Sequence, residues 1–541
     1  MRKAESRKIF LDHLKMKIGM AFFRSLTTVS GLTFLSRILG YIRDVYIGST
    51  FGDSGISDAF FIALRLPNLF RRLFAEGALN SSFVPIFTDI YETGGKEKAL
   101  HFVNLVFTVL ALILLGLVGF FELGMPFVMS FMAMGFKNNP EKFLLAVHFG
   151  YLIFPYIFFI ALASLCASVL NSLNRFFAAT AAPIILNLFA ILAIIFYSTH
   201  TVQAGYALSF SISLSGIAQF LWVFLACWRA RVPIRFSKIE LTAKLKLLLK
   251  RMLPGIAGGG VYQFNLLISD MIASFVPMAI SYLSYADRIN QFPLSLIGIA
   301  MGTVLLPVFS RQIQGKRYQA ALYMQNRALQ FSFALTLPAS VALTVISLPI
   351  IMVLFEYNKF THDMSINVAY ILSIVSFALP ANVVVKIFSA HFFSRGNTKF
   401  PVKAAIVSMI SNIFFNLILF QFFSYFGIAL ASTLSSWINA GLLFYGLRKN
   451  NHLKIDKRLK QTFPLLCFCA FGMGIFLMEA SSILMPYFKQ SFLKSFMSLS
   501  LLISGGLMVY LVLLKITKAF THKEFKETMF RAQKYSEVVD L

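Results

Sequence analysis

Charged residues inside otherwise apolar stretches constrain this chain most. The first apolar stretch contains Arg37, Arg43 and Asp44, in the segment SRILGYIRD. The second apolar stretch contains further ionisable residues, namely Asp58, Arg65, Arg71, Arg72 and Glu76. An ionised side chain at the centre of a membrane helix costs roughly 2.5–3.5 kcal/mol on insertion scales, so it normally faces a polar cavity or a partner. Several arginines in this position predict that an anionic group is handled inside the membrane.

The composition of the chain predicts an integral membrane protein. Of its 541 residues, 58% are hydrophobic and only 13% are charged, whereas soluble domains average about 25% charged residues. Apolar runs of about 20 residues are long enough to cross the hydrocarbon core as helices. The sequence does not show the period-2 alternation that a membrane β-barrel requires. The predicted fold class is therefore an all-α polytopic membrane protein.

The apolar runs predict about 14 transmembrane helices. Their approximate positions are 27–50, 57–92, 98–123, 143–172, 178–199, 204–228, 250–277, 279–313, 322–356, 365–394, 401–424, 426–448, 462–486 and 493–516. Several of these runs exceed the thickness of a bilayer, so we expect tilted or kinked helices.

Basic residues gather in alternate gaps between these predicted spans. The gap before the seventh span is the most basic and contains Arg229, Arg231, Arg235, Lys238, Lys244, Lys246, Lys250 and Arg251. The intervening gaps are nearly bare of charge, with Asp53 in the first. The positive-inside rule then places both termini in the cytoplasm. The net charge of +27 is therefore interpreted as a topology signal and not as a nucleic-acid signal.

The two halves of the chain resemble each other weakly. The matched positions are 83–87 with 305–309, Pro155 with Pro380, Arg175 with Arg395 and Pro183 with Pro401. A near-constant offset of about 220 residues predicts two pseudo-symmetric six-helix lobes in parallel orientation, as in alternating-access transporters. Chance similarity among apolar helices is the alternative.

This organisation predicts the following segments. They are a basic amphipathic N-terminal extension (1–26), an N-lobe (27–228), a cytoplasmic linker (229–249), a C-lobe (250–448), a cytoplasmic loop (449–461), two helices lining a lipid-tail groove (462–516) and a cytoplasmic tail (517–541). The extension lacks the apolar core and small-residue cleavage site of a signal peptide.

Motifs of an energy-supplying or catalytic domain do not occur in the sequence. There is no G-x-x-x-x-G-K-[ST] loop and no H-E-x-x-H motif. The nucleophile elbow G-x-S-x-G is missing as well. We therefore expect a transporter without enzymatic activity, coupled to the membrane potential, an ion gradient or the substrate gradient.

The charged residues of the second span form a stripe. Asp58, Arg65 and Arg72 are spaced by seven residues and Glu76 follows by four, so all four share one face of a helix. The charged residues named above for the first two spans are five arginines and three carboxylates, which leaves a cationic excess among them after pairing. Arginine suits phosphate because its planar fork donates two parallel hydrogen bonds. Internal ion pairs that tie helices together are the alternative, and we favour it for the carboxylates.

Two further polar groups lie in the second half. Asp287 and Arg288 are close to the start of the eighth span. A separate group has carboxylate, amide and hydroxyl oxygens, and its members are Asp270, Asn412, Asn416, Ser432 and Thr433. Such oxygens together could coordinate a hard monovalent cation. A protonated or hydrogen-bonded aspartate in an apolar helix is the alternative for Asp270.

Three long segments resemble the MviN/MurJ family of the MOP exporter superfamily. They are SRILGYIRD, DAFFIALRLPNLFRRLFAEGALNSSFVPIF, and YADRINQFP with GTVLLPVFSR. The resemblance covers essentially the whole chain. It implies a flippase for lipid II, the undecaprenyl-diphosphate-linked peptidoglycan precursor, in the bacterial inner membrane. It also implies fourteen spans in two six-helix lobes plus two extra helices.

The resemblance assigns roles residue by residue. It implies a substrate-binding set of Arg37, Arg43, Arg71, Arg72, Asp287 and Arg288. It implies structural or gating roles for Asp44 and Asp58, to which the stripe adds Arg65 and Glu76. It implies a sodium site formed by Asp270, Asn412, Asn416, Ile428 (through its backbone) and Ser432. Asn416 departs from this pattern, which suggests an acidic residue there.

The predicted function is movement of lipid II from the cytoplasmic to the periplasmic leaflet by alternating access. Expected partners are lipid II, membrane lipids and cell-wall synthesis proteins, and the expected cofactor is at most a sodium ion. An exporter of another lipid-linked oligosaccharide is the nearest alternative. A drug exporter for cations should have an acidic cavity, and a lipid-phosphate enzyme would need a nucleophile or metal cluster. A non-transporting scaffold for cell-wall synthesis would need no cationic cavity.

Overall fold

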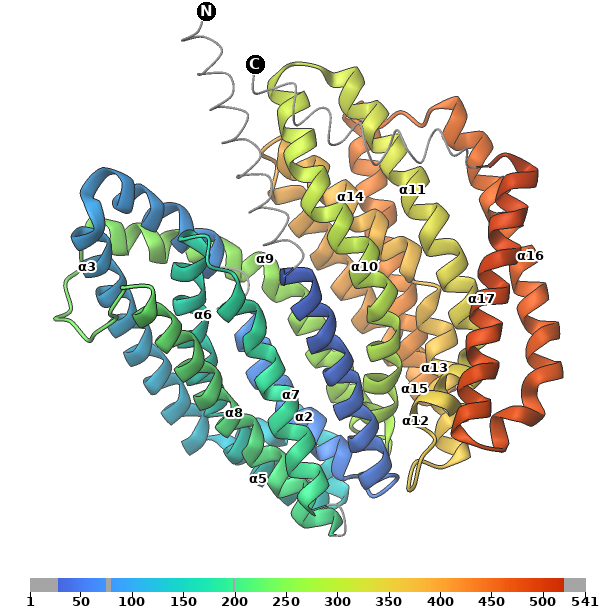
Figure 1. Ribbon diagram of the computed structural model, residues 1–541, viewed down its shortest axis with the longest axis horizontal. Helices are drawn as coiled ribbons and strands as arrows, with labels where there is room; N and C mark the ends of the chain where they lie inside the picture. The colour runs from blue at the N-terminus through green and yellow to red at the C-terminus, as the bar shows by residue number, and fades with distance from the viewer. Residues whose placement is uncertain (1–27, 74–78, 198–199, 520–541) are drawn as a thin grey trace, which may run out of the picture. The chain divides into compact units, whose positions relative to one another are not determined.

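The computed structural model describes residues 28–73, 79–197 and 200–519, and their regular structure is helical (Figure 1). The chain divides into two compact units between Gln263 and Phe264. This division falls inside helix α9 (Ala243–Ala273). The predicted all-α membrane class is confirmed.

The first unit begins with a helix over residues 28–51. It continues with α2 (Ile56–Phe70), α3 (Asn80–Leu123), α4 (Met125–Met132), the 3₁₀ helix η2 (Met134–Asn138), α5 (Pro140–Ile153), α6 (Tyr156–Ser172), α7 (Phe177–Tyr197) and α8 (Thr201–Arg229). A non-helical Gly95 with φ 77° divides α3 into two segments. Glycine suits this position because side chains disfavour positive φ.

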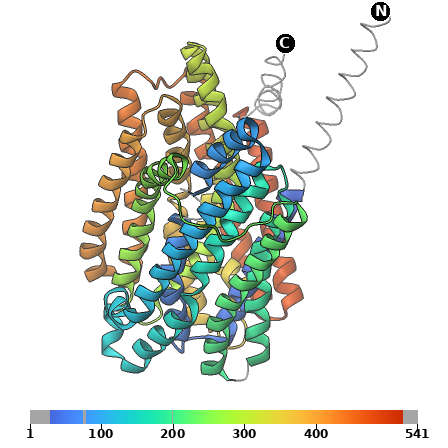
Figure 2. The same ribbon diagram turned by 90° about the vertical axis from the view of Figure 1, so that its left-hand side faces the viewer.

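Helices α6, α7 and α8 pack side by side in the first unit (Figure 2). Lipid tails are as apolar as leucine, so helices in a membrane associate through close packing at small residues. Gly216 of α8 illustrates this, since a Cβ there would lie 2.8 Å from the ring of Tyr156 in α6. Within α3, the rings of Phe83 and Phe102, which lie on the two segments separated by Gly95, stack with their centroids 5.8 Å apart. The result is a tightly packed scaffold for the polar side chains described below.

The second unit contains the remaining helices. They are α10 (Ala279–Gln314), α11 (Tyr318–Val345), α12 (Ser347–Phe355), α13 (His362–Ser376), α14 (Leu379–Ser394), α15 (Lys399–Lys449), α16 (Lys457–Leu484), the 3₁₀ helix η3 (Met485–Lys489) and α17 (Phe492–Thr517). Ser424, with φ 52° and ψ −135°, breaks α15 into two helices. This break falls between the eleventh and twelfth predicted spans.

Nine helices in the described part of the chain are long and apolar enough to cross a membrane. Some of these combine two predicted spans, as Lys399–Lys449 does. Helices outside these nine, such as α2 with its 15 residues, are too short to be counted as spans by length. The chain is therefore a multi-pass membrane protein, and the number of about 14 spans stays a prediction.

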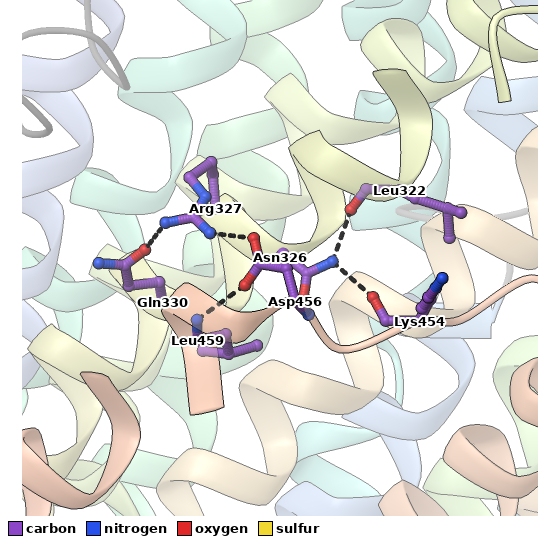
Figure 3. A network of polar contacts seen from close by, with 7 residues as sticks. All are labelled: Leu322, Asn326, Arg327, Gln330, Lys454, Asp456 and Leu459. Atoms are coloured by element: carbon purple, nitrogen blue, oxygen red, sulfur yellow. Dashed lines mark hydrogen bonds and ion pairs between the residues drawn. The ribbon is translucent and has the colours of Figure 1, made fainter. Parts of the chain in front are cut away.

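A polar network fixes the start of α16 on α11 (Figure 3). Arg327 of α11 forms an ion pair with Asp456, which also accepts a hydrogen bond of 2.7 Å from the backbone N–H of Leu459. The neighbouring Asn326 donates to the carbonyl of Lys454 at 2.8 Å and accepts from the N–H of Asp456 at 3.1 Å. Asp456 thus caps α16 and anchors it to α11 through one side chain.

Candidate functional site

The buried pair of Arg43 and Asp44 is the centre of the polar residues in the first unit. Both residues lie on the helix over 28–51, and their side chains are 10% and 3% exposed. Arg43 donates to Asp44 Oδ1 from Nη2 at 2.8 Å and from Nε at 3.0 Å. Its Nη1 donates to Asn187 Oδ1 in α7 at 3.2 Å. The guanidinium is therefore held in a defined orientation by one charged and one neutral acceptor.

Asn187 connects the first helix to α7, and the sequence analysis did not identify it. Its Nδ2 donates to the carbonyl of Ser36 at 2.9 Å. A Cβ at Gly40 would lie 3.5 Å from this Nδ2, so the amide packs directly over the glycine. The available signal was a single amide in the apolar sequence FAATAAPIILNLFAILAIIFY, because polar side chains in membrane helices form contacts between helices.

A second buried ion pair joins α2 to α5. Lys142 Nζ lies 2.6 Å from Oδ2 of Asp58, whose side chain has no exposed surface. The same ammonium lies over the ring of Phe136, 4.2 Å from its centroid. The backbone N–H of Lys142 donates to Oδ1 of Asn139, the N-cap of α5. The partner of Asp58 is thus a lysine in the first turn of α5, which the sequence analysis also missed.

The remaining predicted arginines of the first unit are less buried. Arg37 and Arg65 are half-buried on the first helix and α2, and Arg71 and Arg72 are half-buried just beyond α2. Arg71 Nε donates weakly to Asn68 Oδ1, at 3.4 Å. Residues 71–73 continue α2 with the wider π-helical geometry, which often occurs at functional sites. The fourth member of the predicted stripe, Glu76, lies outside the described residues.

The predicted pair Asp287 and Arg288 belongs to α10 of the second unit. Asp287 accepts a hydrogen bond from the Gln291 side chain one turn later, whereas Arg288 is exposed. Lys386 of α14, which the sequence analysis missed, packs its ammonium against α10 at Gly298. Its signal was a single lysine in the apolar segment LPANVVVKIF, since ionisable residues within membrane helices are by default functional candidates.

The amide cluster, which we define as Ser269, Asn412, Asn416, Ser432 and Ser435, lies between α9 and α15 in the second unit, and Asp270 follows Ser269 in α9. Asn412 and Asn416 have no exposed surface, and Asp270 is 2% exposed. Asn416 Nδ2 donates to Asn412 Oδ1 at 2.8 Å and to Ser269 Oγ at 3.2 Å. Asn412 Nδ2 donates to Ser435 Oγ at 3.3 Å and lies 3.5 Å from Ser432 Oγ. The structure thus brings most of the predicted cation ligands together.

The chemistry of the amide cluster fits a hard monovalent cation. Its acceptors are amide and hydroxyl oxygens, and the buried carboxylate of Asp270 is next to Ser269 in the chain; hard cations prefer such oxygen ligands. Asn416 Oδ1 is buried and has no hydrogen-bond partner within the described residues. In that same part of the chain no group of three His, Cys, Asp or Glu side chains could hold a metal ion. Ser269 and Ser435 extend the predicted set, while Ile428 lies buried on α15.

The family of the chain follows from comparison with known proteins. The sequence model described as lipid II flippase MurJ matches residues 47–525. The chain belongs to the MurJ family. It is 42% identical to a probable lipid II flippase MurJ from Rhizobium meliloti over 455 residues, which cover 83% of this chain and 85% of the relative. The probable lipid II flippase MurJ from Rickettsia prowazekii is 35% identical, with 88% and 93% covered.

Solved structures agree with the MurJ assignment. A lipid II flippase MurJ in an inward closed conformation is 26% identical, with a TM-score of 0.76, and the match covers 90% of this chain and 98% of that one. An inward-facing multidrug resistance MATE family transporter of the MOP superfamily is 16% identical, with a TM-score of 0.64, 77% of this chain and 95% of the other being covered. The second likeness shows the fold alone.

Proposed function

We propose that this member of the MurJ family flips lipid II and that its buried arginines bind the diphosphate of that lipid. The observation that carries the proposal is Arg43, a buried guanidinium with side-chain partners in an apolar helix. Three of its N–H groups donate to Asp44 and Asn187. A guanidinium has five donors, so two remain for phosphoryl oxygens.

The surrounding residues tune this binding. Asp44 offsets the charge of Arg43 when the diphosphate is absent, which lowers the cost of burying a guanidinium. Arg37, Arg71 and Arg72 are more accessible, so in this proposal they attract the headgroup by their charge before it reaches Arg43. Asp287 and Arg288 of the second unit are further substrate-binding residues in this proposal. Asp58 and Arg65 hold or gate α2.

The polyprenyl tail needs an apolar path, for which α16 and α17 are our candidates. These helices expose large apolar side chains, among them Phe471 at 67%, Leu501 at 61% and Leu507 at 55%. Because lipid tails are as apolar as such side chains, the alkyl chain can move from the bilayer onto this surface without losing its apolar surroundings. The network around Asp456 positions the first turn of α16 on α11.

Transport by alternating access requires an energy source. We propose that a sodium ion in the amide cluster, the membrane potential, or both drive the cycle. The buried and unpartnered Asn416 Oδ1 supports a cation there. The proposed setting is the bacterial inner membrane, with both termini in the cytoplasm and with cell-wall synthesis proteins as partners.

The decisive test is the leaflet distribution of lipid II in cells depleted of this protein. We expect lipid II to accumulate in the cytoplasmic leaflet, and we expect rescue by the wild type but not by Arg43→Ala. Because removal of Arg43 takes the guanidinium away from the buried carboxylate of Asp44, the double variant Arg43→Ala/Asp44→Asn tests the same loss without that carboxylate.

The matched control is Arg231→Ala, which removes an exposed arginine of the linker. We expect this variant to rescue fully, and immunoblots of membrane fractions must show equal amounts of all variants. Normal transport by the Arg43→Ala/Asp44→Asn protein would refute the role of the guanidinium. An unchanged distribution of lipid II after depletion, in a host without a second flippase, would refute the flippase itself.

A further inference from the structure

A cavity of about 710 Å³ opens in the first unit, and neither Arg43 nor Asp58 lines it. Its walls come from the start of the helix over 28–51, the ends of α6 and α8, and the beginning of α7. Three candidate membrane spans, Pro140–Ser172, Phe177–Tyr197 and Thr201–Arg229, begin or end there. The cavity therefore lies at one end of the membrane-crossing part of this unit, where lipid headgroups are found.

Two arginines give the cavity its charge. Arg175 lies in the turn between α6 and α7, directly after Asn174, whose φ of 58° reverses the chain. Arg229 is the last residue of α8. Within residues 28–73, 79–197 and 200–519, neither guanidinium has a hydrogen-bond or ion-pair partner, and no carboxylate lines the cavity. Two guanidinium forks on one cavity are suited to a phosphate group.

The rest of the wall is apolar and aromatic. Phe177 and Trp222 face each other with ring centroids 6.4 Å apart, and Leu225 lies one turn along α8. The indole N–H of Trp222 donates to the carbonyl of Ala178 at 3.1 Å, so the indole is held in place. Tryptophan is enriched at membrane interfaces, where one edge of its ring is wet and the other contacts acyl chains.

We propose that this cavity binds an anionic glycerophospholipid. Arg175 and Arg229 hold the phosphodiester, and the first methylenes of an acyl chain lie against Trp222 and Phe177. Basic pockets between membrane helices recognise anionic headgroups in this way. A zwitterionic headgroup is disfavoured because its ammonium would lie beside two guanidinium groups.

The size of the cavity separates this lipid from the transported one. A volume of about 710 Å³ is in the range of sites for small ligands, roughly 300–1,000 Å³. It suits a phosphodiester with a glycerol, whereas the lipid II headgroup carries sugars and a peptide as well. The proposal is therefore independent of the flippase cycle and would stand if that cycle were assigned differently.

Tryptophan fluorescence tests the proposal, since the chain has three tryptophans. Substitutions Trp228→Phe and Trp437→Phe leave Trp222 as the single reporter in the full-length protein. Phosphatidylglycerol or phosphatidylcholine with brominated acyl chains is then added to the protein in detergent micelles. We expect phosphatidylglycerol to quench Trp222 at a roughly tenfold lower mole fraction than phosphatidylcholine. Arg175→Gln/Arg229→Gln should remove this preference.

The control is Arg231→Gln/Arg235→Gln, which removes the same charge from two exposed positions outside the cavity. It should keep the preference. Equal quenching by the two lipids in the single-tryptophan protein would overturn the proposal, as would an undiminished preference after Arg175→Gln/Arg229→Gln. Displacement of brominated phosphatidylglycerol by equimolar undecaprenyl diphosphate would assign the cavity to the transported lipid and would also overturn it.

Discussion

Two sets of buried polar side chains, one in each unit, take different forms. In the first unit they are ionised and paired, with Lys142 2.6 Å from Asp58 and Arg43 2.8 Å from Asp44. In the second unit Asn412 and Asn416, which have no exposed surface, are neutral and bond to each other and to serines. Burial alone therefore does not define a function, because the buried side chains are charged in the first set and neutral in the second.

The two forms suit different ligands. Charges attract each other strongly in a low-dielectric site. The guanidinium of such an ion pair keeps its charge when its partner changes, so a competing anion can bind it in place of the carboxylate. Burying a neutral cluster costs less free energy than burying charges. An acceptor without a partner in the described residues, such as Asn416 Oδ1, still costs free energy until a donor or a cation reaches it. We therefore connect the first unit with the anionic headgroup and the amide cluster with a cation.

The largest effect on stability is expected for Lys142→Met in the first unit. It takes the ammonium away from the buried carboxylate of Asp58, and breaking a buried ion pair in this way costs about 3–5 kcal/mol. The unfolding temperature of the purified protein in detergent should fall markedly. Lys142→Met/Asp58→Asn removes both charges and should recover most of the loss. If the single and double variants unfold at the same temperature, the buried charge of Asp58 is not the cause of the loss of stability.

An intermediate effect is expected for sodium at the amide cluster. A cation that binds only the folded protein stabilises it by about 2.7 kcal/mol at one hundred times its dissociation constant. Replacing potassium chloride by sodium chloride at constant ionic strength should thus raise the unfolding temperature. Asp270→Asn, which removes the buried carboxylate next to the cluster in α9, should abolish this difference. Asp89→Asn, at an exposed position of the first unit, is the control and should keep it. Equal unfolding temperatures in the two salts would refute sodium binding at the amide cluster.

Much of this architecture was predictable because it depends on local sequence. Apolar runs predict membrane helices, and charges within them predict buried polar sites, as for Arg43 and Asp58. The spacing of Asn412 and Asn416 places both amides on one helix face, and in the structure they are bonded. The partners were missed because tertiary packing selects them. Asn187 is 144 residues from Arg43, and Lys142 is 84 residues from Asp58.

The smallest effect is expected for Lys244→Met, which removes an ion pair with the same N···O distance as the buried one. Lys244 Nζ also lies 2.6 Å from an aspartate, Asp89, but the two side chains are 48% and 53% exposed. Water and salt screen such a pair, and exposed pairs contribute only about 0–1 kcal/mol. The unfolding temperature should hardly change, and any change should disappear in high salt. A loss as large as that of Lys142→Met would mean that distance, and not burial, decides what a lysine–aspartate pair contributes to this protein.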